Sequence, residues 1–148
     1  MITDRFIEKI VETQNPTCVG LDTAFEYLPE EMRAGVTDFR GAANAILTFN
    51  RNIIDSVCDI VPSVKVQIAY YEQYGEAGME TFRKTCAYAK EKGLIVITDA
   101  KRNDIGATAS RYSAAFLGET AVGDNRAAAY PSDMLTVNGY LGTDGIAP

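Results

Sequence analysis

Short apolar runs alternate with longer helical patterns along the chain. Four runs rich in β-branched residues are typical of buried strands, at residues 17–21, 64–68, 94–99 and 134–138. Apolar residues recur at helical spacing over residues 3–13, 38–59, 79–92 and 107–117. Residues 118–132 predict a looser connection with room for a helical turn, and residues 139–145 form a glycine-rich loop. This order predicts an α/β fold in which right-handed helical crossovers join parallel strands.

The third predicted strand ends in charged residues. Asp99 and Lys101 are two residues apart, so they point to the same face of a strand, and Asp104 follows just past the strand end. For so short a motif, a strand that stops at a solvated charged turn is the common explanation. The alternative is a functional site, because the carboxyl ends of parallel strands are where α/β folds place their chemistry.

Polar residues also stand at the other predicted strand ends: Asp22, Lys65 with Gln67, and Asn138. If these ends converge, ammonium groups lie between carboxylates, and opposite charges 4 Å apart interact by about 4 kcal/mol at an effective dielectric constant near 20. Such an array keeps Lys101 protonated despite burial, and it can stabilise a charge that moves during a reaction. A lone buried lysine is more often structural, but four polar strand ends in one chain favour a site.

Composition narrows the partners, the location and the types of catalytic site that this chain can have. The 148 residues have the length of one domain, and a net charge of −6 without a basic run argues against nucleic acids or anionic membranes as partners. The sequence has no apolar run of transmembrane length and no signal peptide. Cys18, Cys58 and Cys86 are expected to be reduced thiols in the core, so the sequence predicts a cytoplasmic protein. The absence of histidine excludes Ser-His-Asp and Cys-His catalysis and zinc sites that use histidine. Any proton transfer must therefore use Lys, Asp, Glu, Tyr or Cys.

The polar strand ends lie within four sequence blocks that are recognisable together. The blocks are Val-Gly-Leu-Asp22, Val-Lys65-Val-Gln67, Asp99-Ala-Lys101-Arg-Asn-Asp104-Ile-Gly-Ala-Thr108 and Thr-Val-Asn138-Gly-Tyr-Leu-Gly. In order and spacing they resemble the orotidine 5′-phosphate decarboxylases of the longer bacterial subfamily, from about residue 17 to the end. Thr23 and Gly139 depart from this pattern, since the family often has proline at both positions.

The resemblance implies a (β/α)₈ TIM barrel that works as a homodimer without cofactor or metal. Its reaction belongs to de novo pyrimidine biosynthesis: orotidine 5′-phosphate loses CO₂ from C6 and gives UMP. By motif position, Lys101 stabilises the C6 carbanion and donates the proton, and Asp99 lies beside the departing carboxylate. Lys65 is held between the aspartates and contacts the ribose.

The resemblance also assigns binding roles at the rim of the site. Asp22 contacts a ribose hydroxyl, and Asn138 lines the mouth with no specified role. Asp104, as a catalytic residue, and Thr108, as a substrate-binding residue, are contributed to the site of the neighbouring subunit.

The length of the chain sets a further expectation. A barrel of this kind needs roughly 250 residues, so residues 1–148 are expected to be the N-terminal half of one barrel domain, with about four β/α units. The family's phosphate-binding residues are then absent, and the isolated chain is expected to be inactive. Two alternatives stay open. One is a metal-dependent sugar-phosphate decarboxylase or aldolase of the same superfamily, although those relatives carry a metal-binding Glu where this chain has Lys65. The other is a non-catalytic half-barrel binding module.

Overall fold

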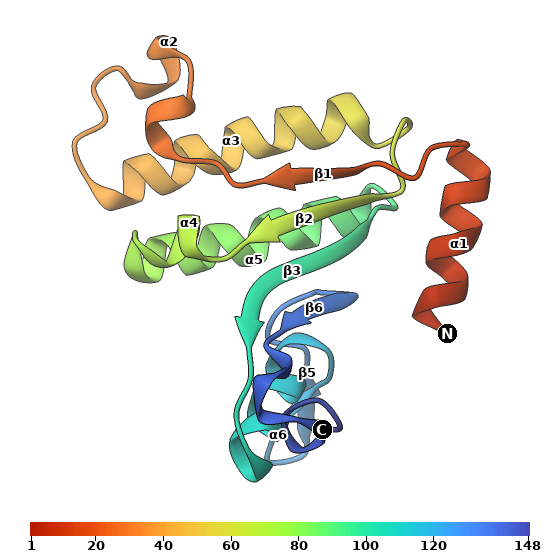
Figure 1. Ribbon diagram of the computed structural model, residues 1–148. Helices are drawn as coiled ribbons and strands as arrows, with labels where there is room; N and C mark the ends of the chain where they lie inside the picture. The colour runs from red at the N-terminus through yellow and green to blue at the C-terminus, as the bar shows by residue number, and fades with distance from the viewer.

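A four-stranded parallel sheet forms the centre of the protein, in a computed structural model that describes residues 1–148. The strands follow one another in the order β1-β2-β3-β6, which is also their order along the chain (Figure 1). Their bounds are β1 (Cys18–Leu21), β2 (Ser63–Gln67), β3 (Ile95–Arg102) and β6 (Met134–Val137). All three pairings in this sheet are parallel. The predicted α/β fold with parallel strands is confirmed.

The longer helices agree with the predicted ones to within a few residues, except at the start of α5. They are α1 (Ile2–Thr13), α3 (Phe39–Val57), α5 (Gly75–Glu91) and α6 (Gly106–Phe116), and the short ones are α2 (Glu30–Arg33) and α4 (Ala69–Glu72). Asp38 begins α3 because its carboxylate accepts a hydrogen bond of 2.7 Å from the Gly41 amide. In Figure 1, α3 and α5 lie along the sheet, and α6 lies beyond the bend of β3.

The core lies between the sheet and the pair α3 and α5. Val64 and Val66 of β2 are fully buried, as are Ile46 of α3 and Phe82 of α5. Because side chains alternate along a strand, Lys65 points to the opposite face of the sheet and is only half-buried. The alternation therefore separates an apolar core from a polar face.

Helix α5 begins earlier than its sequence indicates. Gly78 suggests a break before a helix at Met79, but the helix starts at Gly75 and includes Gly78. A Cβ at position 78 would collide with the carbonyl oxygen of Tyr71 in α4. Gly78 thus allows the two helices to pack closely, which outweighs its low helix propensity.

Other expectations are wrong at the edges of the molecule. Residues 118–132 hold an antiparallel hairpin, β4 (Thr120–Val122) and β5 (Asn125–Ala127), instead of a helical turn. Strand β1 is buried only at Leu21, because it lies at an edge of the sheet. For the same reason Cys18 is exposed; Cys58 is half-buried, and of the three thiols only Cys86 is in the core. The glycine-rich loop contains two 3₁₀ turns, η2 (Gly139–Leu141) and η3 (Thr143–Gly145).

The helices of this protein differ from membrane-spanning segments in length or in apolar character. None of them combines the length and the apolar character that crossing a bilayer requires.

Candidate active site

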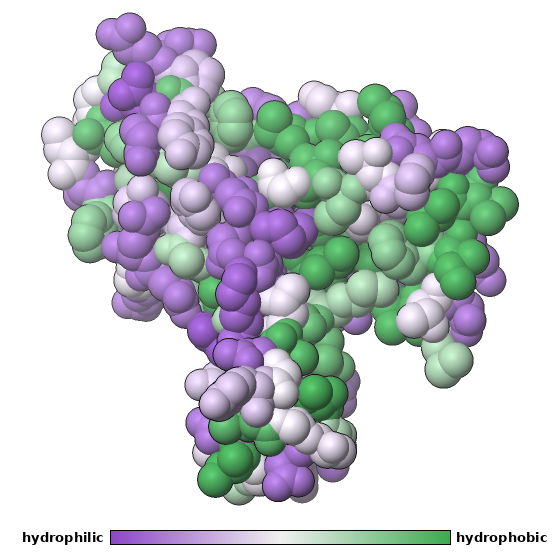
Figure 2. Space-filling view, in the orientation of Figure 1, coloured by the Kyte–Doolittle hydropathy of each residue, from purple (hydrophilic) through white to green (hydrophobic).

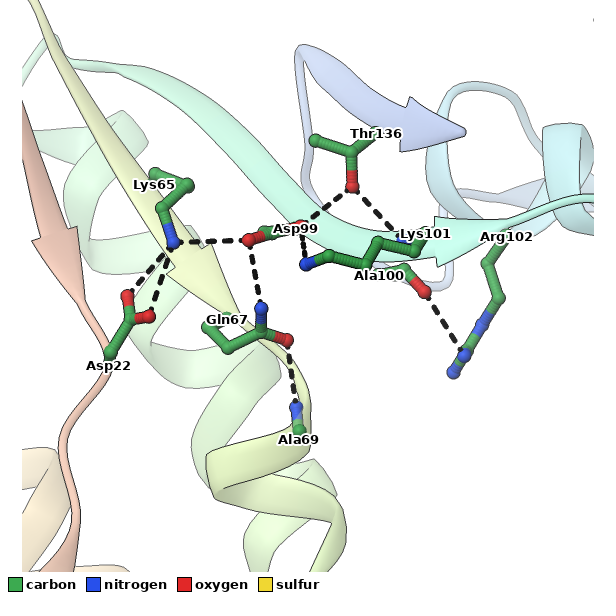
Figure 3. Close-up of polar contacts among 9 residues, drawn as sticks. All are labelled: Asp22, Lys65, Gln67, Ala69, Asp99, Ala100, Lys101, Arg102 and Thr136. Carbon is green, nitrogen blue, oxygen red and sulfur yellow. Dashed lines mark hydrogen bonds and ion pairs between the residues drawn. The ribbon is translucent and has the colours of Figure 1, made fainter. Parts of the chain in front are cut away.

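Four charged side chains meet where β1, β2 and β3 end (Figure 3). The Lys65 ammonium lies 2.9 Å from Oδ1 of Asp22 and 3.1 Å from Oδ2 of Asp99. The Lys101 ammonium lies 2.6 Å from Oδ1 of Asp99. Carboxylate and ammonium thus alternate in the order Asp22, Lys65, Asp99, Lys101, which we call the charged array. The predicted meeting of these side chains is confirmed.

Strand register explains why the array forms. In the parallel ladder Gln67 of β2 is the partner of Asp99 in β3, and Lys65 precedes Gln67 by two residues on the same face. The Gln67 amide donates to Oδ2 of Asp99 at 2.8 Å, and its own oxygen accepts the Ala69 N–H at 3.3 Å at the start of α4. Figure 2 shows hydrophilic surface over this end of the strands, beside hydrophobic surface on the sheet.

Asp99 is the most enclosed member of the charged array, with 10% of its side chain exposed. Lys101 and Thr136 donate to Oδ1, at 2.6 and 2.8 Å, while Lys65 and Gln67 donate to Oδ2. Burial by itself would raise the pKa of Asp99, but the hydrogen bonds from Lys101, Thr136 and Lys65 outweigh it and lower that pKa to about 2. The carboxylate is therefore ionised throughout the neutral range.

The two lysines differ in their surroundings. Burial would lower the pKa of Lys65, but its hydrogen bonds to Asp22 and Asp99 prevail and raise it, so Lys65 is a fixed cation. Lys101 was expected to be buried, which is wrong: 65% of its side chain is exposed. Asp99 is the only protein acceptor of its ammonium group, which leaves two N–H groups free to bind a ligand.

A bulge in β3 places Lys101 at the rim. Thr98 pairs with Leu135 and Arg102 with Val137, so three residues of β3 face the single residue Thr136 of β6. Lys101 adopts a φ of 50°, in the left-handed region that non-glycine residues rarely occupy. Such strain is typical of sites where function fixes the backbone.

Comparison with known proteins agrees with this geometry. Residues 17–148 match the model of the orotidine 5′-phosphate decarboxylase / HUMPS family. The chain belongs to this family. Curated orotidine 5′-phosphate decarboxylases from Clostridium perfringens and Rhodopirellula baltica are 41% and 45% identical to it, over 100% and 94% of the chain.

Solved structures support the same fold. A Streptomyces avermitilis protein described as an orotidine 5′-phosphate decarboxylase matches this chain with a TM-score of 0.77 and 31% identity. The match covers 99% of this chain and 47% of the Streptomyces chain. The Leishmania donovani decarboxylase has the same fold, with a TM-score of 0.72. These neighbours are TIM barrels. The parallel sheet described above corresponds to roughly half of their (β/α)₈ architecture. The chain spans about half the length of the curated relatives it matches.

Three of the predicted family residues lie outside the charged array. Asp104 accepts a hydrogen bond of 2.7 Å from the Ile105 amide in the turn before α6, and Thr108 is exposed in the first turn of that helix. Asn138 was expected at the common mouth, but its side-chain oxygen accepts the Tyr140 N–H at 2.9 Å and begins η2. None of these three side chains contacts a member of the charged array, and the roles given to Asp104, Thr108 and Asn138 stay predictions.

Sequence reasoning missed one partner of the charged array and assigned no role to another. Thr136 is a polar residue inside an apolar strand, and that contrast was the available signal. Gln67 shares a face with Lys65, as the period of two for a strand indicates. No group of three or more Cys, Asp or Glu side chains is arranged to hold a metal ion.

Proposed function

We propose that this chain is the N-terminal half of a single (β/α)₈ barrel domain that converts orotidine 5′-phosphate to UMP. The proposal rests above all on the continuous contact of Asp22, Lys65, Asp99 and Lys101 at the strand ends. An alternating array of this kind suits a reaction in which negative charge moves from a carboxylate to a carbon atom. The same arrangement needs no cofactor for the step described next.

The proposed chemistry takes place at the Lys101 ammonium. The bond between C6 and the carboxylate breaks, CO₂ leaves, and the electron pair stays on C6, where the ammonium stabilises it. Lys101 then gives one proton to C6, which yields UMP and a neutral amine that water reprotonates. Asp99 stays ionised beside it, and its Oδ1 accepts the Lys101 ammonium at 2.6 Å, which fixes the position of the proposed proton donor before the bond breaks.

Lys65 and Asp104 complete the catalytic set with Lys101 and Asp99, and the other members of the site are assigned to binding. Lys65 and Asp22 contact the ribose, and 43% of the Asp22 side chain is exposed to an incoming ligand. Asn138 lines the mouth of the site. Asp104 and Thr108 reach the site of a neighbouring subunit in a cytoplasmic homodimer, and sedimentation of the complete protein as a monomer would contradict this part of the proposal.

Turnover of orotidine 5′-phosphate by the complete protein that contains this chain tests the function. The loss of substrate absorbance is followed and UMP is identified as the product. Residues 1–148 alone are expected to show no useful turnover, because binding energy from a remote phosphate normally supports chemistry at the base. A complete, folded protein that leaves orotidine 5′-phosphate unchanged would overturn the proposal.

A further inference from the structure

Thr136 of β6 lies between two members of the charged array. Its hydroxyl accepts the backbone N–H of Lys101 at 3.0 Å and lies 2.8 Å from Oδ1 of Asp99 (Figure 3). Oδ1 also accepts the Lys101 ammonium, so three contacts join Thr136, Asp99 and Lys101 in a closed ring. One side chain on the next strand therefore contacts both residues to which the proposed function assigns the chemistry.

The bulge explains why a side chain is needed at this point. Three residues of β3, from Asp99 to Lys101, face Thr136 alone, so the regular backbone ladder cannot continue there. The gap in the ladder leaves the Lys101 N–H to a side-chain acceptor. The Thr136 hydroxyl accepts the Lys101 N–H in place of a backbone carbonyl, and thereby stabilises the strained φ of 50° at Lys101.

The direction of both hydrogen bonds is fixed by chemistry. A backbone N–H can only donate, so the Thr136 oxygen must accept from Lys101. The single hydroxyl proton is then free for Asp99, and an ionised carboxylate can only accept it. The same hydroxyl therefore sets the position of the Lys101 backbone relative to the Asp99 carboxylate.

We propose that Thr136 is a positioning residue, whose hydroxyl ties the Lys101 backbone to the Asp99 carboxylate and so sets the geometry of the proton donor. The inference deepens the proposed decarboxylase function and rests on it for its kinetic consequence. Its structural consequence, a single hydroxyl that protects the Lys101 amide and contacts Asp99, is measurable without any turnover.

Three variants of the complete protein test the proposal. Thr136→Val keeps the branched shape and removes the hydroxyl, and Thr136→Ser keeps the hydroxyl. Thr98→Val is the matched control, because Thr98 is a buried threonine of the adjacent strand whose hydroxyl makes no hydrogen bond within the protein. Circular dichroism establishes that each variant is folded, and Thr136→Ala replaces Thr136→Val if the valine cannot be accommodated.

The readouts are hydrogen exchange of the Lys101 amide, the carboxyl NMR signal of Asp99, and kcat and KM for orotidine 5′-phosphate. Thr136→Val should lose the exchange protection and shift the Asp99 signal, and its kcat should fall about 10- to 100-fold while KM changes less than about threefold. Thr136→Ser should recover the protection and most of kcat. Thr98→Val should match the wild type.

The outcomes separate this inference from the proposed function. Unchanged Lys101 exchange and an unchanged Asp99 signal in folded Thr136→Val would overturn the inference, and so would a kcat equal to that of the wild type. Thr136→Ser behaving like Thr136→Val would overturn it as well. If the wild-type protein does not turn over orotidine 5′-phosphate, the proposed function fails, while the exchange and NMR measurements still decide whether the hydroxyl joins Lys101 to Asp99.

Discussion

Both oxygens of the Asp99 carboxylate are occupied by donors, two from ammonium groups and two from neutral side chains. Such saturation explains how an acid with 10% of its side chain exposed remains charged beside an apolar sheet. It also fixes both lysines relative to one another. At the scale of the single residue, Asp99 sets the position of the proposed proton donor.

The low pKa of Asp99 makes a prediction about stability. Its carboxylate has a pKa of about 2 in the folded protein, against about 3.9 for an unperturbed aspartate. The stabilisation is therefore present above pH 4 and is lost as the pH falls from about 4 through about 2. At pH 7 we expect Asp99→Asn to lower the free energy of unfolding by about 3 kcal/mol at most from this source.

Urea unfolding of the complete protein between pH 7 and pH 2 measures this effect. The difference between wild type and Asp99→Asn should shrink below pH 4. Asp59→Asn is the control, because Asp59 is exposed and forms no ion pair. A difference between wild type and Asp99→Asn that does not change with pH would contradict the assignment.

Two local features shape the elements around the site. The bulge in β3 turns Lys101 toward the rim, and Gly78 lets α5 pack against the carbonyl oxygen of Tyr71. The second feature matters to the charged array because α4 follows β2 directly, and the Ala69 amide at its start holds Gln67 in contact with Asp99. The packing of these short elements thus extends to the carboxylate.

Gly78→Ala should therefore destabilise the protein, although the same change in an exposed helix normally stabilises it by about 1 kcal/mol. The added methyl group would overlap the Tyr71 carbonyl oxygen, so we expect a loss of about 2–4 kcal/mol in the free energy of unfolding. Chemical denaturation measures it. The control is Gly118→Ala, whose added carbon would make only ordinary contacts, at 3.4 Å or more from Ala114. A Gly78→Ala protein that is more stable than the wild type would refute the packing argument.

Periodicity predicted the strands, most helices and the face shared by Asp99 and Lys101, because these depend on spacing alone. It could not predict that β1 is exposed, since burial depends on the position of a strand in the sheet. The bulge was equally hidden, because it depends on how β3 pairs with β6, so the exposure of Lys101 could not be predicted. For Thr136 the only signal was a polar residue inside an apolar strand, which does not identify Asp99 as its partner. Gly78 was misinterpreted because its neighbour in space, Tyr71, belongs to another helix.

At the scale of the whole molecule, the chain spans about half the length of its curated relatives. Strands β1 and β6 are the two edges of the sheet (Figure 1), and the charged array joins β1, β2 and β3 (Figure 3). Every member of the array belongs to the described sheet or to the residue that follows β1. This half thus carries the charges of the proposed reaction, while the assay of that reaction requires the complete protein.

The most direct test of the central claim is the turnover of orotidine 5′-phosphate by the complete protein with and without Lys101→Ala. Because 65% of the Lys101 side chain is exposed, the variant should keep its circular dichroism spectrum, and its stability should fall by no more than the part of the Asp99 stabilisation that Lys101 supplies. We predict that kcat falls about 1000-fold or more, since the substitution removes both the charge that stabilises the carbanion and the proton donor. Lys84→Ala, which removes a lysine paired with Glu80 on α5 away from the charged array, should leave kcat unchanged. A Lys101→Ala protein that retains most of the wild-type rate would contradict the claim that this ammonium stabilises the C6 carbanion.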